Sequence, residues 1–309
     1  MSWASPDPHP VPDLPARTPA AKALLSAVAL RRRRWLWALG SLGLAGAAGA
    51  AYTRFCEPGW LEVTHHVVPL RPTETKPIRI LHLSDLHASA CVPLEFISEA
   101  VRLGLAEKPD LICLTGDFIT KHFADWNAYA AVLKPLAAAA PVFACLGNHD
   151  GGKWAARPAY GGHADHRAIR SCLAASGVKV LLNQSEEIRL RSRRVRLVGV
   201  GDLWGEELHA AEAFGASAAA DLTLLLMHNP DGKDAVAGFR WDLALCGHTH
   251  GGQLRLPWLG TPFAPVRDHR FVAGLNRWRD RWIFTTRGVG NLHGLRFNCR
   301  PEVSLLTLN

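Results

Sequence analysis

From about Lys76 onward, short apolar runs alternate with stretches of helical periodicity. The runs are too short for helices and are rich in branched residues, so we predict that they form buried strands. These predicted strands cover residues 78–83, 111–114, 142–146, 195–200, 222–227 and 243–246. Stretches at 94–106, 126–138 and 166–176 have an amphipathic pattern typical of covering helices.

Such alternation predicts an α/β sandwich with sheet inside and helices outside. Polar blocks follow the predicted strands directly, which places them on loops at one rim, where α/β sheets gather their ligands. Two stretches without clear periodicity, 151–167 and 251–276, are predicted to be long loops at this rim.

The N-terminal part of the chain has a different pattern. Six prolines lie within residues 1–19, and we expect residues 1–30 to be a disordered tail and basic lead-in. Arginines 31–34 precede an uncharged stretch, 35–52, which as a helix would span about 27 Å. Residues 31–55 are therefore interpreted as a transmembrane anchor or as a twin-arginine export signal. Residues 56–75 are assigned to a linker and 76–309 to the catalytic domain.

Both interpretations give the same sidedness, because arginines ahead of an apolar stretch keep the N-terminus in the cytoplasm. We expect the protein at the inner membrane, with its catalytic domain on the periplasmic side. The composition agrees with one large core, since 48% of the 309 residues are hydrophobic. The net charge of +8 lies in local patches and makes nucleic acid an unlikely partner. The seven cysteines include no CxxC pair, and no disulfide framework is predicted.

Five polar blocks carry the candidate chemistry. They are Ser84-Asp85-Leu86-His87, Gly116-Asp117, Gly147-Asn148-His149-Asp150, Met227-His228 and Gly247-His248-Thr249-His250. Carboxylate and amide oxygens together with imidazole nitrogens suit Mn, Fe or Zn better than Ca²⁺ or a thiolate-bound structural zinc. An isolated histidine is more often a core or surface residue, but His228 ends an apolar strand and supplies the one imidazole still needed.

In this order the blocks resemble those of the calcineurin-like metallophosphoesterases, over about residues 76–308. Residues 56–60, 246–255, 285–290 and 298–303 extend the resemblance to the membrane-associated YaeI-type phosphodiesterases. The resemblance implies a four-layer α/β/β/α sandwich with a dinuclear metal site at the strand ends. It also implies two divalent cations as cofactors, whose identity the sequence leaves open.

Carried over by position, the family pattern assigns three ligands to one metal, three to the other and one to both. The first metal would be held by Asp85, His87 and His250, the second by Asn148, His228 and His248, and Asp117 would bridge them. The resemblance places His149 beside the substrate as phosphate contact or proton donor, with Asp150 orienting it. His163, Asp165 and His166 also have ligand chemistry, but they match no family ligand and are expected to be solvated loop residues.

The resulting hypothesis is a metal-dependent phosphodiesterase that cleaves a phosphate diester or pyrophosphate through a hydroxide held between the two ions. The relatedness of this branch to enzymes acting on UDP-2,3-diacylglucosamine makes a lipid-linked substrate one candidate. The alternatives are a phosphomonoesterase or nuclease of the same fold, and a non-catalytic, membrane-tethered metal-binding protein. A nuclease would need a basic, aromatic-lined groove, for which Trp154, Arg157 and Tyr160 give only a hint.

Overall fold

The computed structural model describes residues 19–70, 76–216 and 220–309. The chain divides into two compact units, Met1–Ala50 and Ala51–Asn309. Helix α1 covers Pro19–Ala51. The tail predicted for residues 1–30 is therefore wrong in its second part, where proline at the first helical turn is followed by the good helix formers of Ala20–Leu25. Residues 1–18 lie outside the described part.

Among the residues that the structure describes, no helix combines the length and the apolar character needed to span a bilayer. The second unit contains every strand of the described chain and the five helices that follow α1. These helices are α2 (Leu94–Ala106), α3 (Trp126–Ala139), α4 (Gly152–Ala155), α5 (Arg167–Ala175) and α6 (Ala210–Phe214).

The first sheet has six strands in the order β1-β12-β2-β3-β4-β5. Strands β2 to β5 run parallel to one another, whereas β1 and β12 run in the opposite direction. The bounds are β1 (Glu62–Val68), β2 (Ile78–Leu83), β3 (Leu111–Thr115), β4 (Val142–Cys145), β5 (Lys179–Val180) and β12 (Glu302–Leu308). The C-terminal ends of β2, β3 and β4 therefore share one rim.

The second sheet also has six strands, in the order β10-β11-β9-β8-β7-β6. Its four inner strands are parallel and its two edge strands antiparallel to them. The bounds are β6 (Gln184–Leu190), β7 (Arg193–Gly199), β8 (Leu222–Leu226), β9 (Leu243–Cys246), β10 (Gly274–Trp278) and β11 (Arg281–Thr285).

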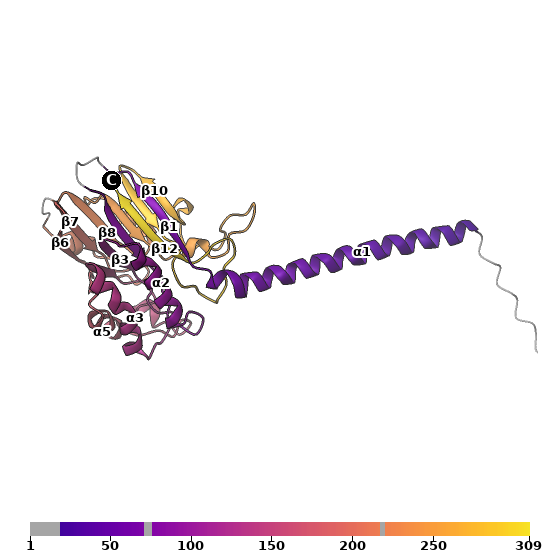
Figure 1. Cartoon of the computed structure of the whole chain (residues 1–309), viewed down its shortest axis with the longest axis horizontal. Coiled ribbons are helices and arrows are strands. Elements are labelled where there is room, and N and C mark those ends of the chain that lie inside the picture. The colour runs from indigo at the N-terminus through magenta and orange to yellow at the C-terminus, as the bar shows by residue number, and fades with distance from the viewer. Residues whose placement is uncertain (1–18, 71–75, 217–219) are drawn as a thin grey trace, which may run out of the picture. The chain divides into compact units, whose positions relative to one another are not determined.

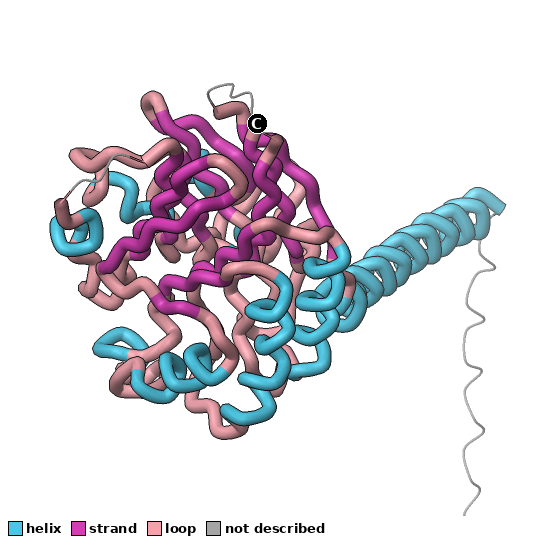
Figure 2. The backbone as a smooth tube through the Cα atoms, turned by 60° about the vertical axis from the view of Figure 1, so that its left-hand side comes forward, coloured by secondary structure: helices cyan, strands magenta, loops and turns pink. Residues whose placement is uncertain are grey.

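Three apolar clusters define the layers. One lies between the sheets and joins residues of β2 and β3, such as Ile80 and Leu111, to residues of β8 and β9, such as Leu224 and Leu243. The second packs α2, α3 and α5 on the outer face of the first sheet; these helices lie together beside the strands in Figure 1. The third covers the second sheet with α6 and short 3-10 turns. Two stacked mixed sheets with helices outside them make the α/β sandwich, and Figure 2 shows the strands at its centre.

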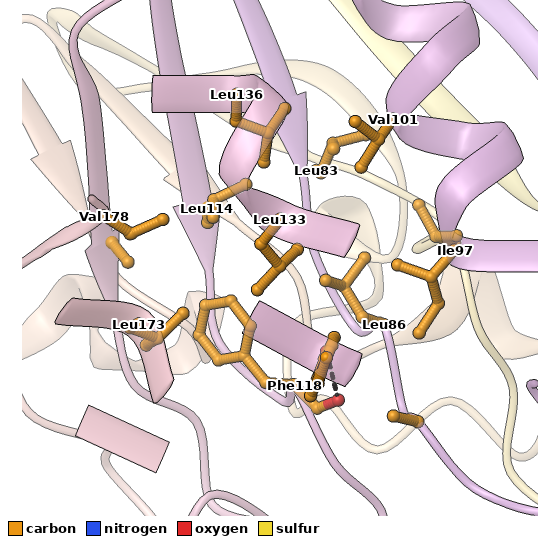
Figure 3. Close-up of a cluster of buried hydrophobic side chains, with 14 of the residues drawn as sticks. Leu83, Leu86, Ile97, Val101, Leu114, Phe118, Leu133, Leu136, Leu173 and Val178 are labelled. Atoms are coloured by element: carbon orange, nitrogen blue, oxygen red, sulfur yellow. Dashed lines mark hydrogen bonds between the residues drawn. The ribbon is translucent and has the colours of Figure 1, made fainter. Parts of the chain in front are cut away.

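Strand β2 shows how the sequence builds two cores at once. Its residues alternate, so that Ile78 and Ile80 face the second sheet while Leu81 and Leu83 face the helices. Figure 3 shows Leu83 and Leu114 meeting Ile97 and Val101 of α2 and Leu133 of α3. Because both faces of the strand are covered, its sequence is almost continuously apolar.

The predicted strands and helices are confirmed, with ends that differ by at most two residues. The prediction of a linker over residues 56–75 is wrong in part, because Glu62–Val68 forms β1. The four edge strands, β1, β5, β6 and β10, were all missed, since polar and charged residues are common on sheet edges. Strands β11 and β12 were missed as well. The long loop predicted for 151–167 contains α4, and that for 251–276 includes the beginning of β10.

Candidate metal centre

The five polar blocks converge at the rim where the parallel strands of both sheets end. Each block follows its strand within three residues, after β2, β3, β4, β8 and β9 in turn. Backbone hydrogen bonds connect the loops, such as the bond from Asp85 N to Gly116 O at 2.9 Å. Neighbouring strand ends thus bring residues far apart in the sequence into one cluster.

Five of the seven predicted ligands have a left-handed backbone. Their φ angles are 52° at Asp85, 48° at His87, 53° at Asp117, 70° at His248 and 50° at His250. Such angles are uncommon outside glycine and cost of order 1–3 kcal/mol each. Their concentration at one rim indicates that the fold fixes these side chains in a required direction.

Two glycines of the blocks permit this close packing. A Cβ atom at Gly247 would collide with the side chains of Ser84 and Asp85, and one at Gly147 would collide with Asp117. The backbone of each glycine therefore lies directly against a ligand carboxylate. Gly147 and Gly247 are required because there is no room for a larger side chain at either position.

Asp85, His87 and His250 form the first ligand group, with ligand atoms within 4.8 Å of one another. The Nε2 atoms of His87 and His250 are 3.1 Å apart, and Nε2 of His250 is 3.4 Å from Oδ1 of Asp85. The backbone N–H of His248 donates to the Asp85 carboxylate at 3.0 Å. The three side chains predicted for the first metal are thus brought together.

Asp117, His228 and His248 form the second group by the same measure. Asn148 belongs with it, because its Oδ1 lies 3.0 Å from Nδ1 of His248. Nδ1 of His248 is also 3.2 Å from Nε2 of His228. The four side chains predicted for this metal, including the shared carboxylate, lie together.

Asp117 joins the two groups. Its Oδ2 lies 3.4 Å from Nε2 of His87, in the first group, and 3.2 Å from Nε2 of His228, in the second. Its other oxygen accepts a hydrogen bond from the backbone N–H of His149 at 2.9 Å. One carboxylate oxygen is therefore within reach of both sites.

The donor set fits divalent cations. Imidazole nitrogens face each other in two pairs, His87 with His250 and His228 with His248. Two neutral imidazoles cannot both direct a lone pair at the other at this distance unless a proton or a cation lies between them. Burial lowers the pKa of His87 to about 3, and it also lowers the pKa values of His248 and His250. The neutral form that binds metal is thus favoured at these three positions.

The carboxylates and His228 differ from those imidazoles. Burial raises the pKa of Asp85, although nearby His228 acts against it. Burial opposes ionisation of Asp117 as well, but His228, His149 and His87 outweigh it and hold the Asp117 pKa well below its usual range. Burial likewise opposes protonation of His228, while Asp117 and Asp85 raise its pKa above the ordinary value. The buried carboxylates thus create demand for positive charge, which a cation satisfies.

Hydrogen bonds to backbone carbonyls fix the tautomers of the His228 and His149 rings. Nδ1 of His228 donates to the carbonyl of Thr115 at 2.7 Å, which leaves Nε2 for a metal. Nδ1 of His149 donates to the carbonyl of Thr120 at 2.7 Å. Sequence reasoning missed both threonines, since it had no means of finding a backbone carbonyl that contacts a distant ring.

Asp150 has a different role from the one predicted. Its carboxylate accepts backbone hydrogen bonds from Asp117 at 2.8 Å, Phe118 at 2.7 Å and Gly147 at 2.8 Å. The prediction that it orients the His149 ring is wrong, because that ring is held by Thr120. Asp150 is a positioning residue that ties the loop after β3 to the loop after β4.

Aromatic side chains line the cluster beside His149. Trp154 lies with its ring centre 4.6 Å from that of His149 and stacks on Tyr160 at 3.8 Å. Trp204 packs edge-on against His248 at 4.3 Å. Trp154 and Tyr160, two of the residues considered for an aromatic-lined groove, thus lie beside His149, whereas Trp204 was not predicted.

The weaker candidates make contacts of their own, and the expectation of a solvated residue is wrong for His166, whose side chain is 13% exposed and has Nδ1 3.4 Å from the Asp150 carbonyl oxygen. Nε2 of His163 accepts from the backbone of Phe123, Asp165 pairs with Arg167, and His166 contacts Glu207 at 2.7 Å. Neither of the two ligand groups found among the described residues includes them. The chain's seven cysteines are free, and Cys113, Cys145 and Cys246 are buried in the core as expected.

The motif 285–290, at the end of β11, packs against Asp85. Arg296 is fully buried and donates to the carbonyls of Arg287, Gly288 and Cys299 at 2.8 to 3.1 Å. The loop that it holds donates from Gly290 N to the Asp85 carbonyl at 2.7 Å. The motif 285–290 belongs to the resemblance noted in the sequence, but its contact with a metal ligand was not predicted.

Comparisons with known proteins agree with this geometry. Residues 78–252 match the family model described as calcineurin-like phosphoesterase. The chain is 46% identical over 280 residues to "Phosphodiesterase YaeI" of Escherichia coli, covering 90% of this chain and 99% of that protein. It is 28% identical to "Uncharacterized metallophosphoesterase YkuE" of Bacillus subtilis, covering 88% and 93%. It is 25% identical to "UDP-2,3-diacylglucosamine pyrophosphatase LpxG" of Chlamydia muridarum, covering 81% and 90%.

Proposed function

The chain belongs to the calcineurin-like phosphoesterase family, and on this premise we propose that it is a metal-dependent phosphodiesterase. The observation that carries the proposal is the position of Asp117, one carboxylate shared between two groups of metal ligands. A shared carboxylate suits two cations held close together, the arrangement by which two-metal sites stabilise the attacking and leaving oxygens of phosphoester hydrolysis.

The ligand charges favour a phosphate anion. Two divalent cations would bring four positive charges, Asp85 and Asp117 would remove two and a hydroxide one more, so the loaded site would keep about +1. When bound, the cations supply Lewis acidity and lower the pKa of a coordinated water. Neutral Asn148 and four histidines complete the set without removing further charge.

His149 is assigned to the substrate. Its Nδ1 is engaged with Thr120, which leaves Nε2 as the ring atom free to contact phosphate or to give a proton to the departing oxygen. Trp154 packs against the ring and restricts its rotation. An alkoxide is a poor leaving group, so a fixed acid at this point benefits hydrolysis of a diester.

The substrate is proposed to be a phosphate diester or pyrophosphate. The relative with 46% identity is named a phosphodiesterase, and the LpxG relatives are named pyrophosphatases of a lipid-linked nucleotide. A lipid-linked ester is therefore the first candidate to test. Trp204, partly exposed beside His248, could stack on a planar group of such a substrate.

The proposed location is the outer face of the cytoplasmic membrane. Arginines 31–34 precede the uncharged stretch 35–52, an order that favours export of the following domain across the membrane. Protease added to bacterial spheroplasts should then digest the second unit. Protection of the domain until the cells are lysed would show that it is cytoplasmic.

The activity is tested with an aryl phosphodiester, the matched aryl monoester and single-stranded DNA. We expect Mn²⁺-dependent release of the aryl group from the diester, loss of turnover with chelator, and much slower cleavage of the other two. Preference for the monoester or for DNA would favour the corresponding alternative. A folded protein that binds metal and cleaves none of them would favour the non-catalytic one. Asp117→Asn is the inactive control.

A further inference from the structure

A short hairpin in the loop after the last metal ligands holds apolar side chains in water. Leu256 and Gly260 exchange backbone hydrogen bonds of 2.8 and 2.9 Å, with Trp258 between them. Trp258 is fully exposed, and Leu259 and Phe263 are 73% and 68% exposed. We call these three residues the apolar tip.

The hairpin holds the apolar tip in a defined and energetically costly conformation. Trp258 has φ of 63°, a left-handed conformation that is costly for a large aromatic residue. Leaving each of its side chains in water forgoes roughly 1.5–3 kcal/mol of burial. A backbone held in this conformation by paired hydrogen bonds indicates that the exposed side chains have a partner outside the chain.

The hairpin is attached to the metal centre. A Cβ atom at Gly252, two residues after His250, would collide with Thr261, so the backbone of this glycine packs directly against the loop. On the other side, Arg255 N donates to the carbonyl of Phe297 at 2.8 Å. The apolar tip is therefore fixed relative to the metal ligands.

The beginning of the second unit adjoins the same support. The ring of Tyr52 lies 6.4 Å from that of Phe297, and the backbone N–H of Arg296 donates to Thr53 at 3.0 Å. The segment 52–60 adds two exposed aromatic residues, Phe55 and Trp60. Tyr52 thus contacts Phe297, the residue that also pairs with the hairpin at Arg255.

Arginines accompany the exposed aromatic residues. The guanidinium of Arg54 lies 5.4 Å from the Phe55 ring centre, and that of Arg300 lies 4.1 Å from the ring centre of Trp60. Residues 253–267 include Arg255 and Arg267 and no acidic residue. Aromatic side chains beside arginines are typical of segments that lie in the headgroup region of anionic bilayers.

The size of the tip favours a bilayer over a protein partner. Aromatic side chains bury about 150–250 Å² each. The three residues of the tip therefore fall short of the about 800 Å² that a stable protein interface buries on each side. A bilayer interface has no such minimum, because each inserted side chain contributes by itself.

We propose that the apolar tip inserts into the interface of an anionic lipid bilayer and holds the rim with the metal centre against the membrane. This contact rests on the proposed membrane location, and it is separate from any attachment by stretch 35–52. It brings the ligand cluster to the surface where a lipid-linked phosphate would be presented.

The direct test is the fluorescence of Trp258 in the full-length protein. The emission contributed by Trp258 is obtained by subtracting the spectrum of Trp258→Phe from that of the parent. With vesicles of phosphatidylcholine and phosphatidylglycerol this emission should shift to shorter wavelength and be quenched by brominated lipid. Emission that stays unshifted and unquenched overturns the proposal, even if the N-terminal segment holds the protein on the vesicle.

Trp282→Phe is the matched control. Trp282 is partly exposed near the start of β11, at the end away from the metal rim, and its indole N–H donates to the carbonyl of Pro69. Its subtracted emission should not be quenched. Quenching with phosphatidylcholine alone equal to that with the anionic mixture would contradict the role of the arginines.

Replacing Trp258, Leu259 and Phe263 together by serine should weaken vesicle binding at least about tenfold if the tip contributes its expected burial energy. Self-association of the parent that disappears in this triple variant would instead identify a second copy as the partner. The parent's hydrolysis of a soluble aryl diester without lipid is measured alongside. Quenching without hydrolysis counts against the proposed function, and hydrolysis without quenching counts against the apolar tip.

Discussion

Oδ2 of Asp150 accepts a hydrogen bond of 2.8 Å from the backbone N–H of Asp117, the residue shared by the two ligand groups. The same oxygen accepts from Gly147, one residue before Asn148. A fully buried carboxylate thus fixes the backbone of a bridging ligand and of a ligand to the second site. Metal affinity should depend on a residue that holds no metal.

Asp150→Asn should weaken metal binding and stability together. The asparagine amide cannot accept all the backbone hydrogen bonds that the carboxylate accepts, and each lost bond to a charged group costs about 1.5–3 kcal/mol. We expect Mn²⁺ affinity to fall about 10- to 100-fold in calorimetric titration. Asp165→Asn, on an exposed side chain nearby, is the control and should bind normally. Equal affinity of Asp150→Asn and the parent would contradict the positioning role.

Gly247→Ala should damage the first metal site. The new methyl group would collide with Ser84 and with the Asp85 carboxylate, so the ligand must move. Hydrolysis of the aryl diester should fall about 100-fold, with a matching loss of Mn²⁺ affinity. Gly238→Ala serves as control, because its Cβ would meet open space. Similar activity of both variants would show that close packing at Gly247 is unimportant.

His149→Ala should separate two roles of this histidine. If it protonates the leaving oxygen, the rate for an alkyl diester should fall about 100- to 10,000-fold, while a p-nitrophenyl diester, whose leaving group needs no proton, should lose much less. Equal losses for both substrates would mean that His149 only contacts the phosphate. The comparison needs steady-state rates of the parent and of His149→Ala with both substrates.

Glu302 should contribute stability that depends on pH. Burial disfavours its charged form, but His66, Arg287 and Thr64 outweigh burial and lower its pKa below the ordinary value. A carboxylate with a depressed pKa in the folded state stabilises above its unfolded pKa of about 4.3, and this stability is lost as pH falls. Glu302→Gln should therefore cost about 3 kcal/mol at pH 7 in urea unfolding. The cost should shrink as pH decreases from about 5 to 3.

The control for Glu302 is Glu99→Gln, which removes an exposed pair with Arg102. We expect little change in unfolding at either pH. A cost of Glu302→Gln that stays constant from pH 7 to pH 3 would show that the ionised carboxylate is not the stabilising form.

The sequence predicted the inner strands and the ligands because both have local signals. An inner strand such as β3 is apolar on both faces, and each ligand block follows such a strand directly. The edge strand β6 carries Glu187 and Arg189 on its exposed face and Glu186 beside Ile188 on the other, so its pattern does not differ from that of a loop. Burial by a neighbouring strand decides which polar segments become strands, and a single sequence does not contain that information.

The contacts behind the ligands could not be predicted for a related reason. Thr120 supports His149 through its backbone carbonyl, which any residue type would supply. Asp150 stands next to His149 in the sequence, and this adjacency led to the wrong prediction of its partner. In the structure its carboxylate points instead to backbone N–H groups across two loops.

The number of metal ions bound per chain, measured by elemental analysis together with diester turnover, tests the central claim most directly. We predict two ions per chain in the active parent. Asp117→Asn, which alters the shared ligand, should lose metal and turnover together, and His163→Ala should keep both. A parent that is fully active with one ion or none, or an Asp117→Asn variant that keeps two ions and full turnover, would contradict the account.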